Sequence, residues 1–302
     1  DDDHVDRAGV FAHAVSSVAE LVDDGPVRTV IRARGTLRSG QISVEFMQQI
    51  TFSRALRRID FQTELTGHGA RYRVRVAFPT PFVGGRIAHA IPFGQERRPE
   101  GEYPGQGWLV YGNDRASVAL LNRGLPGANV TDGVLMLSLL RSVAMEEKGP
   151  SVQGFEDGVK HTFSYSVIPA DPAHAIEPWL EAEALNAPPI AITAADVRPR
   201  EEPRLLVEPG NVALSALYLD GEHVTARLYE AAGLPCSATL WMAGLIGCRE
   251  TDALSTEGAP VPVADETAYL AFRPFEIKTV RLEVTRTPQR ERRPTSSRSR
   301  TT

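Results

Sequence analysis

Alternation of apolar and polar residues is the feature that most constrains how this chain can fold. Between residues 41 and 52, even-numbered positions are mostly apolar and the positions between them mostly polar. The pattern repeats over residues 59–65 and 72–78. Because successive side chains of a strand point to opposite faces, the pattern predicts half-buried strands. Strands of this kind belong to antiparallel sheets with one solvated face. Val134–Leu140 is apolar on both faces and is expected to be a central strand.

Turn signals separate these runs, among them Thr66–Gly69, while helical periodicity is confined to residues 173–187. Many short strands broken by turns are typical of sandwiches. We therefore predict an all-β protein: a large antiparallel β-sandwich followed by a smaller C-terminal β-sandwich. The expected boundaries are residues 1–170 for the large sandwich, 171–204 for an Ala/Pro-rich connector, 205–284 for the small sandwich and 285–302 for a disordered basic tail.

Charge and composition limit the partners of the chain. Its formal net charge is −5, but residues 285–302 hold six Arg and one Glu, a net of +5, so the remainder sums to −10. An acidic body disfavours nucleic acid as the main partner, although the basic tail leaves a nucleic-acid arm open. No apolar run approaches the roughly 20 residues of a membrane span. The start at Asp1-Asp2-Asp3, without Met, leads us to expect a piece of a longer protein.

Motifs that carry catalysis are missing from the sequence. None of the seven His residues forms HxH, HxxxH or HExxH, and the two Cys residues, Cys236 and Cys248, form no CxxC. There is no GxSxG elbow, although a glycosidase-type pair of carboxylates is not excluded by counting. The residues alone therefore predict a β-sandwich protein without a recognisable site. The cysteines leave the compartment undetermined, with the cytoplasm favoured, and homo-oligomerisation stays open.

Several segments resemble the C-terminal region of bacterial family 38 glycoside hydrolases, which are α-mannosidases. Ala268–Leu282 reads AYLAFRPFEIKTVRL, similar to the closing strands of that family, and VTARLYEAAG at residues 224–233 precedes it in the expected order. In the first half, RIDFQTEL from residue 58, IPFG from residue 91 and LMLSLLRS from residue 135 are similar to the family's paired strands. The resemblance covers about residues 20–284.

The resemblance implies a parent enzyme that removes α-linked mannose with retention of configuration. In such an enzyme an N-terminal barrel holds zinc, an Asp nucleophile and an acid/base Asp. None of those motifs lies in this chain, so we expect no catalytic residue, no metal ligand and no cofactor here, and no activity of the chain alone. The implied partners are the catalytic barrel of the same enzyme and a mannose-containing glycan.

Two residues are candidates for contact with that glycan. Arg141 ends the apolar run at residues 134–140, in a region that the resemblance places near the barrel mouth, and its guanidinium suits vicinal hydroxyls. A strand-closing ion pair is the alternative for Arg141. Trp108, in a Gly-rich loop, could stack on sugar. The chain departs from the family at Thr66–Gly69 and at residues 145–153, which puts the role of the second segment in doubt.

Two other classes of function compete with the mannosidase interpretation. One is an independent, lectin-like carbohydrate-binding module; such sites often present aromatic platforms, for which Trp108 is a candidate. The other is a purely structural assembly domain. An upstream barrel with zinc-ligand motifs in the same reading frame would favour the mannosidase interpretation.

Overall fold

The computed structural model describes residues 13–69, 72–142, 158–190, 193, 204–221, 223–254 and 258–285. These residues form 22 strands and one helix. The chain divides into two compact units, residues 1–193 and 194–302, and each is considered by itself. The all-β prediction is confirmed, since every strand pair in both units is antiparallel.

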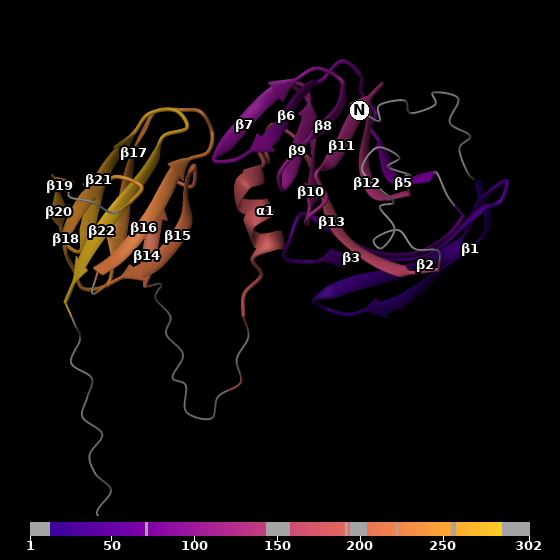
Figure 1. Ribbon diagram of the computed structural model, residues 1–302, viewed down its shortest axis with the longest axis horizontal. Helices are drawn as coiled ribbons and strands as arrows, with labels where there is room; N and C mark the ends of the chain where they lie inside the picture. The colour runs from indigo at the N-terminus through magenta and orange to yellow at the C-terminus, as the bar shows by residue number, and fades with distance from the viewer. Residues whose placement is uncertain are drawn as a thin grey trace, which may run out of the picture. The chain divides into compact units, whose positions relative to one another are not determined.

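The first unit contains one large and one small sheet (Figure 1). The large sheet has nine strands in the order β1-β2-β3-β4-β13-β10-β9-β6-β7, and the small sheet has the order β5-β12-β11-β8. In the large sheet the strands are β1 (His13–Asp24), β2 (Arg28–Ser39), β3 (Ile42–Ser53), β4 (Ile59–His68), β6 (Arg86–Ile91), β7 (Gly94–Arg98), β9 (Trp108–Gly112), β10 (Ser117–Asn122) and β13 (Lys160–Ala170). In the small sheet they are β5 (Tyr72–Pro79), β8 (Gly101–Pro104), β11 (Gly127–Thr131) and β12 (Val134–Ser142).

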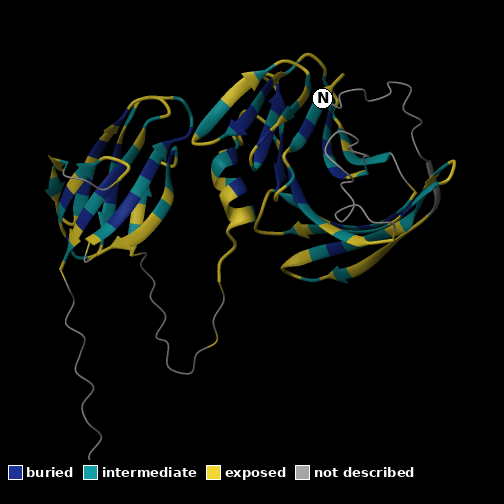
Figure 2. Cartoon of the chain, viewed as in Figure 1, coloured by how far each residue is buried: buried dark blue, intermediate teal, exposed yellow. Residues whose placement is uncertain are grey.

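The core of the first unit lies between these two sheets. Leu135, Leu137 and, beyond a register shift after Ser138, Leu140 of β12 point into it. From the large sheet, Leu109 and Tyr111 of β9 meet them and are almost fully buried. Figure 2 shows this buried layer in dark blue. As predicted, the strand containing residues 134–140 lies inside its sheet rather than at an edge.

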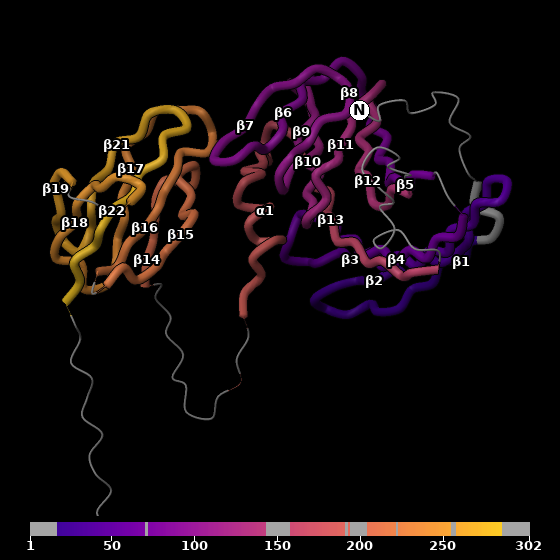
Figure 3. The backbone as a smooth tube through the Cα atoms, viewed as in Figure 1, coloured from indigo at the N-terminus to yellow at the C-terminus, as the bar shows by residue number. Residues whose placement is uncertain are grey.

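Helix α1 (Pro178–Asn186) packs on the opposite face of the large sheet, over β9 and β10. Figure 3 shows the chain leaving β13 and entering this helix. Ala182 is buried there against a second apolar cluster, which comprises Ala90, Trp108, Ala119, Leu121 and Ile168. Part of the predicted connector is therefore an element of the first unit, because its helix has an apolar sheet face to cover. Residues 191–192 and 194–203 of that connector lie outside the described residues.

Gly67 lies in strand β4, where the sequence predicted a turn over residues 66–69. Its Cα faces the ring of Tyr72 from the small sheet: a Cβ added at Gly67 would overlap the Tyr72 hydroxyl and lie 2.9 Å from its Cζ. The glycine therefore serves close approach of the two sheets, which is a common reason for glycine inside a strand.

Replacing Gly67 with Ala is expected to destabilise the first unit by about 2 kcal/mol, because overpacking forces Tyr72 to move. Urea unfolding of Gly67→Ala measures the change. The double variant Gly67→Ala, Tyr72→Leu removes the clashing ring, so the alanine should cost less in that background than in the wild type. An equal cost in both backgrounds would contradict the packing explanation.

The second unit is a smaller sandwich of two sheets, with the orders β14-β17-β21-β20 and β15-β16-β22-β18-β19. Its strands are β14 (Leu205–Glu208), β15 (Val212–Asp220), β16 (His223–Glu230), β17 (Cys236–Met242), β18 (Leu245–Thr251), β19 (Ala259–Val261), β20 (Val263–Ala264), β21 (Thr267–Phe272) and β22 (Ile277–Val284). Leu228, Leu240, Val280 and Leu282 are nearly inaccessible to solvent and form the centre of its core. Residues 286–302 of the predicted tail lie outside the described residues.

A buried carboxylate joins two turns of this second unit. Glu230 is 0% exposed, and Asn211 Nδ2 donates to its Oε1 at 2.9 Å. Four backbone N–H groups also donate to the carboxylate, those of Ala232, Gly233, Leu234 and Phe275. The segments LYEAAG and RPFE, which carried the family resemblance, are therefore tied together through one side chain.

Candidate functional site

Arg141 lies at the end of β12, on the face of the small sheet that points away from the core. Its neighbour Leu140 is buried, whereas Arg141 itself is exposed. The strand register places Arg141 directly opposite Arg73 of β5. Arg75, two residues along β5, and Ser138, its cross-strand partner on β12, lie on the same outer face.

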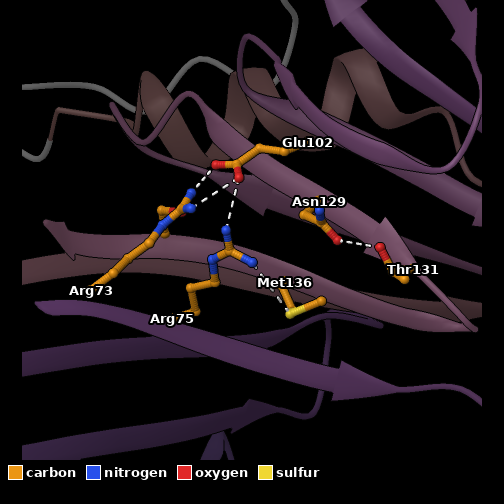
Figure 4. A network of polar contacts seen from close by, with 7 residues as sticks. Arg73, Arg75, Glu102, Asn129, Thr131 and Met136 are labelled. Atoms are coloured by element: carbon orange, nitrogen blue, oxygen red, sulfur yellow. Dashed lines mark hydrogen bonds and ion pairs between the residues drawn. The ribbon is translucent and has the colours of Figure 1, made fainter. Parts of the chain in front are cut away.

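Glu102 of β8 joins Arg73 and Arg75, and through Arg73 also Ser138, in one network. Arg73 donates to both carboxylate oxygens of Glu102, through Nη1 at 2.9 Å and through Nη2, and Arg75 Nη2 donates to Oε2 at 2.8 Å. Arg73 also donates to the Ser138 hydroxyl, from Nη2 at 2.7 Å and from Nε at 3.1 Å. Figure 4 shows both guanidinium groups directed toward the one carboxylate. We call Arg73, Arg75, Glu102, Ser138 and Arg141 the arginine face.

Arg73 and Arg75 of the arginine face share the one carboxylate of Glu102. Burial lowers the pKa of the Arg75 guanidinium, which nevertheless stays protonated. The Arg75 Nε atom is buried and has no hydrogen-bond partner among the described residues, and Arg75 Nη1 contacts only the weak acceptor Met136 Sδ, at 3.8 Å.

Trp108 lies elsewhere and has a different role from the one that the sequence suggested. It begins strand β9 instead of standing in a loop, and its side chain belongs to the apolar cluster under α1. At 4% exposure its ring has no free face for stacking on a sugar. Trp108 is thus a core residue, because α1 covers the sheet face to which it points.

Metal ligands do not gather in the parts of the chain that the structure describes: no group of three or more His, Cys, Asp or Glu residues there could hold an ion. No helix among the described residues is long and apolar enough to cross a membrane. Residues 145–153, the segment that departs from the family pattern, lie outside the described residues.

The sequence identified Arg141 but not its surroundings. Arg73 and Arg75 alternate with apolar residues on β5, which reads as an ordinary solvated strand face. The sequence signal that could have pointed to Arg73 and Arg75 is the recurrence of arginine on one face of a strand in an acidic chain. Glu102, from a four-residue strand 27 residues further along, could not be connected to them without the sheet order.

The chain is similar to a known protein family and to known proteins. Residues 6–148, which include most of both sheets of the first unit, match the family model described as "Glycosyl hydrolases family 38 C-terminal domain". The match to the family 38 C-terminal domain therefore applies to residues 6–148, just under half of the chain. Human alpha-mannosidase 2C1 is 25% identical to the chain over 248 residues, which is 74% of this chain and 23% of that protein. The mouse protein of the same name is 27% identical over 256 residues, with the same coverage.

Solved structures agree with the family 38 assignment at the level of fold. An alpha-mannosidase from Enterococcus faecalis V583 superposes with a TM-score of 0.73 at 18% identity, covering 89% of this chain and 35% of that one. A family 38 protein from Enterococcus faecalis gives a TM-score of 0.72 at the same identity, covering 89% of this chain and 36% of that chain. The chain thus spans about a quarter of the length of its curated relatives and about a third of these structures.

Proposed function

We propose that this chain is the non-catalytic C-terminal part of a retaining, zinc-dependent α-mannosidase, in which it supports the catalytic barrel and contributes to the glycan site. The observation that carries the proposal is the family 38 match on the first unit, together with relatives named alpha-mannosidase that are about four times longer than the matched stretch. Zinc and the two catalytic carboxylates would belong to the barrel.

Within this proposal Arg141 is the residue that contacts the substrate. It is exposed at the end of β12, on a strand held in register by β5 and β11. A guanidinium offers five N–H donors in a rigid plane, a geometry that fits neighbouring sugar hydroxyls. No residue of this chain is assigned to attack the anomeric carbon or to protonate the leaving oxygen. A lectin-like module is not favoured, because Trp108 is buried.

In the full-length enzyme, Arg141→Ala is expected to lower kcat/KM for an aryl α-mannoside severalfold, because hydrogen bonds to the sugar are lost. Arg141→Lys should recover part of the loss, since it keeps the charge without the planar donors. Arg115→Ala, an exposed arginine in the turn between β9 and β10, is the matched control and should leave the kinetics unchanged. Unchanged kinetics in Arg141→Ala would remove the substrate role, and turnover by the 302-residue chain alone would contradict its non-catalytic assignment.

A further inference from the structure

A hollow of about 220 Å³ opens on the outer face of the large sheet, next to the part of that face that α1 covers. Residues of β6, β7, β9 and β10 line it, and β6 and β7 form one edge of that sheet (Figure 1). Ala88 and Val110 pack against the apolar cluster under α1 and also line the hollow, so helix and hollow share one face. Pockets for drug-sized ligands measure about 300–1,000 Å³, which limits the occupant of this hollow to a small group.

Small residues in register form the floor of the hollow. Ala88 of β6 pairs with Val110 of β9, and Gly112 of β9 pairs with Ser117 of β10. A Cβ added at Gly112 would overlap the side chain of Ser117, so only glycine fits there. Because none of these side chains is long, the sheet surface stays sunken between the longer side chains at its rim.

Two arginines stand at the rim, on the same face as this floor. Arg97 of β7 pairs with Ala88 of β6, and Arg86 lies two residues before Ala88 on the same strand. Arg86 and Arg97 are therefore diagonal neighbours across two adjacent strands. Diagonal neighbours on one face of a sheet lie about 7–8 Å apart, within reach of long side chains. Both guanidinium groups can thus meet over the floor.

The two arginines differ in their partners. Arg86 Nη2 donates to Asp114 Oδ1, whereas Arg97 is exposed and makes no hydrogen bond or ion pair with any residue that the structure describes. No Asp or Glu is among the residues that line the hollow. Two arginines and the carboxylate of Asp114 leave a formal charge of +1 at the rim, carried by a guanidinium whose donors are available to a ligand.

Neutral donors complete the rim on the side away from β7. Asn113 Oδ1 accepts the backbone N–H groups of Arg115 and Ala116 at 2.9 and 3.1 Å, which leaves the Nδ2 amide for a ligand. Ser117 adds a hydroxyl. A phosphate monoester presents three strong acceptor oxygens, which suits donors on several sides better than the two oxygens of a planar carboxylate do.

We propose that this hollow binds a phosphate group, either as the free ion or as the monoester of a small sugar. Arg97 supplies a planar pair of N–H donors for two of the phosphate oxygens. The bound anion also relieves the repulsion between Arg86 and Arg97. Ala88 and Val110 give an attached sugar ring an apolar surface to rest on. The site needs no residue outside this chain and is independent of the proposed function.

Titration of the isotope-labelled 302-residue chain with inorganic phosphate, followed by NMR, tests the proposal. Amide signals of residues 86–88, 95–97 and 110–117 are expected to shift and to saturate. Potassium chloride at matched ionic strength should leave them in place. A hexose phosphate and the same hexose without phosphate distinguish the two sources: tighter binding of the hexose phosphate than of inorganic phosphate assigns a sugar-borne group, and equal binding assigns the free ion.

Three variants separate the hollow from general surface charge. Arg97→Ala should weaken phosphate binding about tenfold, because a charge-assisted hydrogen bond is lost. Ala88→Leu keeps every charge but fills the floor, so it should weaken binding at least as much. Arg115→Ala removes an exposed arginine of the neighbouring turn that does not line the hollow, and this matched control should bind as the wild type does. Thermal melting checks folding, and Arg97→Ala, at an exposed position, keeps the test valid if Ala88→Leu does not fold.

Four results would overturn the proposal. The first is the absence of saturable shifts with phosphate, and the second is shifts of equal size with potassium chloride. The third is binding of the unphosphorylated hexose as tight as that of the hexose phosphate, which would make the hollow a site for neutral sugar. The fourth is an equal effect of Arg97→Ala and Arg115→Ala, because binding would then depend on the overall positive charge of this edge.

Discussion

Glu230→Ala is expected to unfold the second unit under conditions in which the wild type is stable. The substitution removes the acceptor of five hydrogen bonds at a site that is 0% exposed. Each buried donor left without a partner costs about 1–3 kcal/mol, so a loss of roughly 4 kcal/mol or more is expected. For a unit of this size that corresponds to a fall in Tm of about 15 °C or more. Scanning calorimetry measures it.

Two further variants define the cause. Glu230→Gln keeps the shape but turns an amide NH₂ toward N–H donors, so it should also destabilise, although less than Ala. Glu283→Ala, at an exposed position of β22, should change stability by no more than about 0.5 kcal/mol. If Glu230→Ala melts like Glu283→Ala, the carboxylate is not what ties the two turns together.

The same hydrogen bonds predict a pH dependence. Burial by itself would raise the pKa of the Glu230 carboxyl, but the donors, Phe275 N–H and Asn211 foremost, outweigh it and hold the pKa below its ordinary value. A carboxyl with a lowered pKa in the folded state contributes stability above its unfolded pKa and loses it as the pH falls through the folded pKa. The contribution of Glu230 is therefore complete at neutral pH and disappears in acid.

The sequence predicted most of the fold because the hydrophobic period was locally decisive. Strands with clear alternation, such as β3, were predicted close to their observed limits. Strand β18 (LIGCRET) shows no such alternation, since only Leu245 and Cys248 of its residues are buried. The register shift between residues 245 and 247 accounts for their spacing. The prediction of a turn at Gly67 was wrong. The residue that requires glycine there is Tyr72, which belongs to another sheet.

The functional surface was less predictable than the fold. Arg141 was identified through the family resemblance. Only the sheet order β5-β12-β11-β8 shows that Glu102 and Ser138 lie close to the arginines of β5. Trp108 was assigned to the surface because glycines flank it, but the chain cannot reveal locally that α1, some 70 residues later, covers it. Contacts between distant elements decide which polar residues cooperate, and single-strand patterns do not contain that information.

His89 is expected to make the first unit sensitive to mild acid. It lies on β6, is 0% exposed, and neither ring nitrogen has a hydrogen-bond partner among the described residues. Tyr103 meets its ring edge-on, with centroids 5.7 Å apart, and Arg98 lies over that tyrosine. Burial and, after it, the charge of Arg98 lower the pKa of His89 to about 4, while Glu96 partly opposes them.

The direction of this pH dependence follows from the pH at which the unfolded and the folded chain each bind a proton at His89. An unfolded chain takes up a proton at His89 near pH 6.5, whereas the folded chain does so only near pH 4. Stability is therefore complete above pH 6.5 and falls by about 3 kcal/mol as the pH drops from 6.5 to 4. Urea unfolding across this range should show that decline in the wild type.

His89→Phe, which keeps an aromatic ring against Tyr103 but cannot be protonated, should flatten the decline. His223→Gln removes an exposed histidine of the second unit and should leave the decline of the first unit unchanged. A His89→Phe profile as steep as that of the wild type would assign the acid sensitivity to other groups.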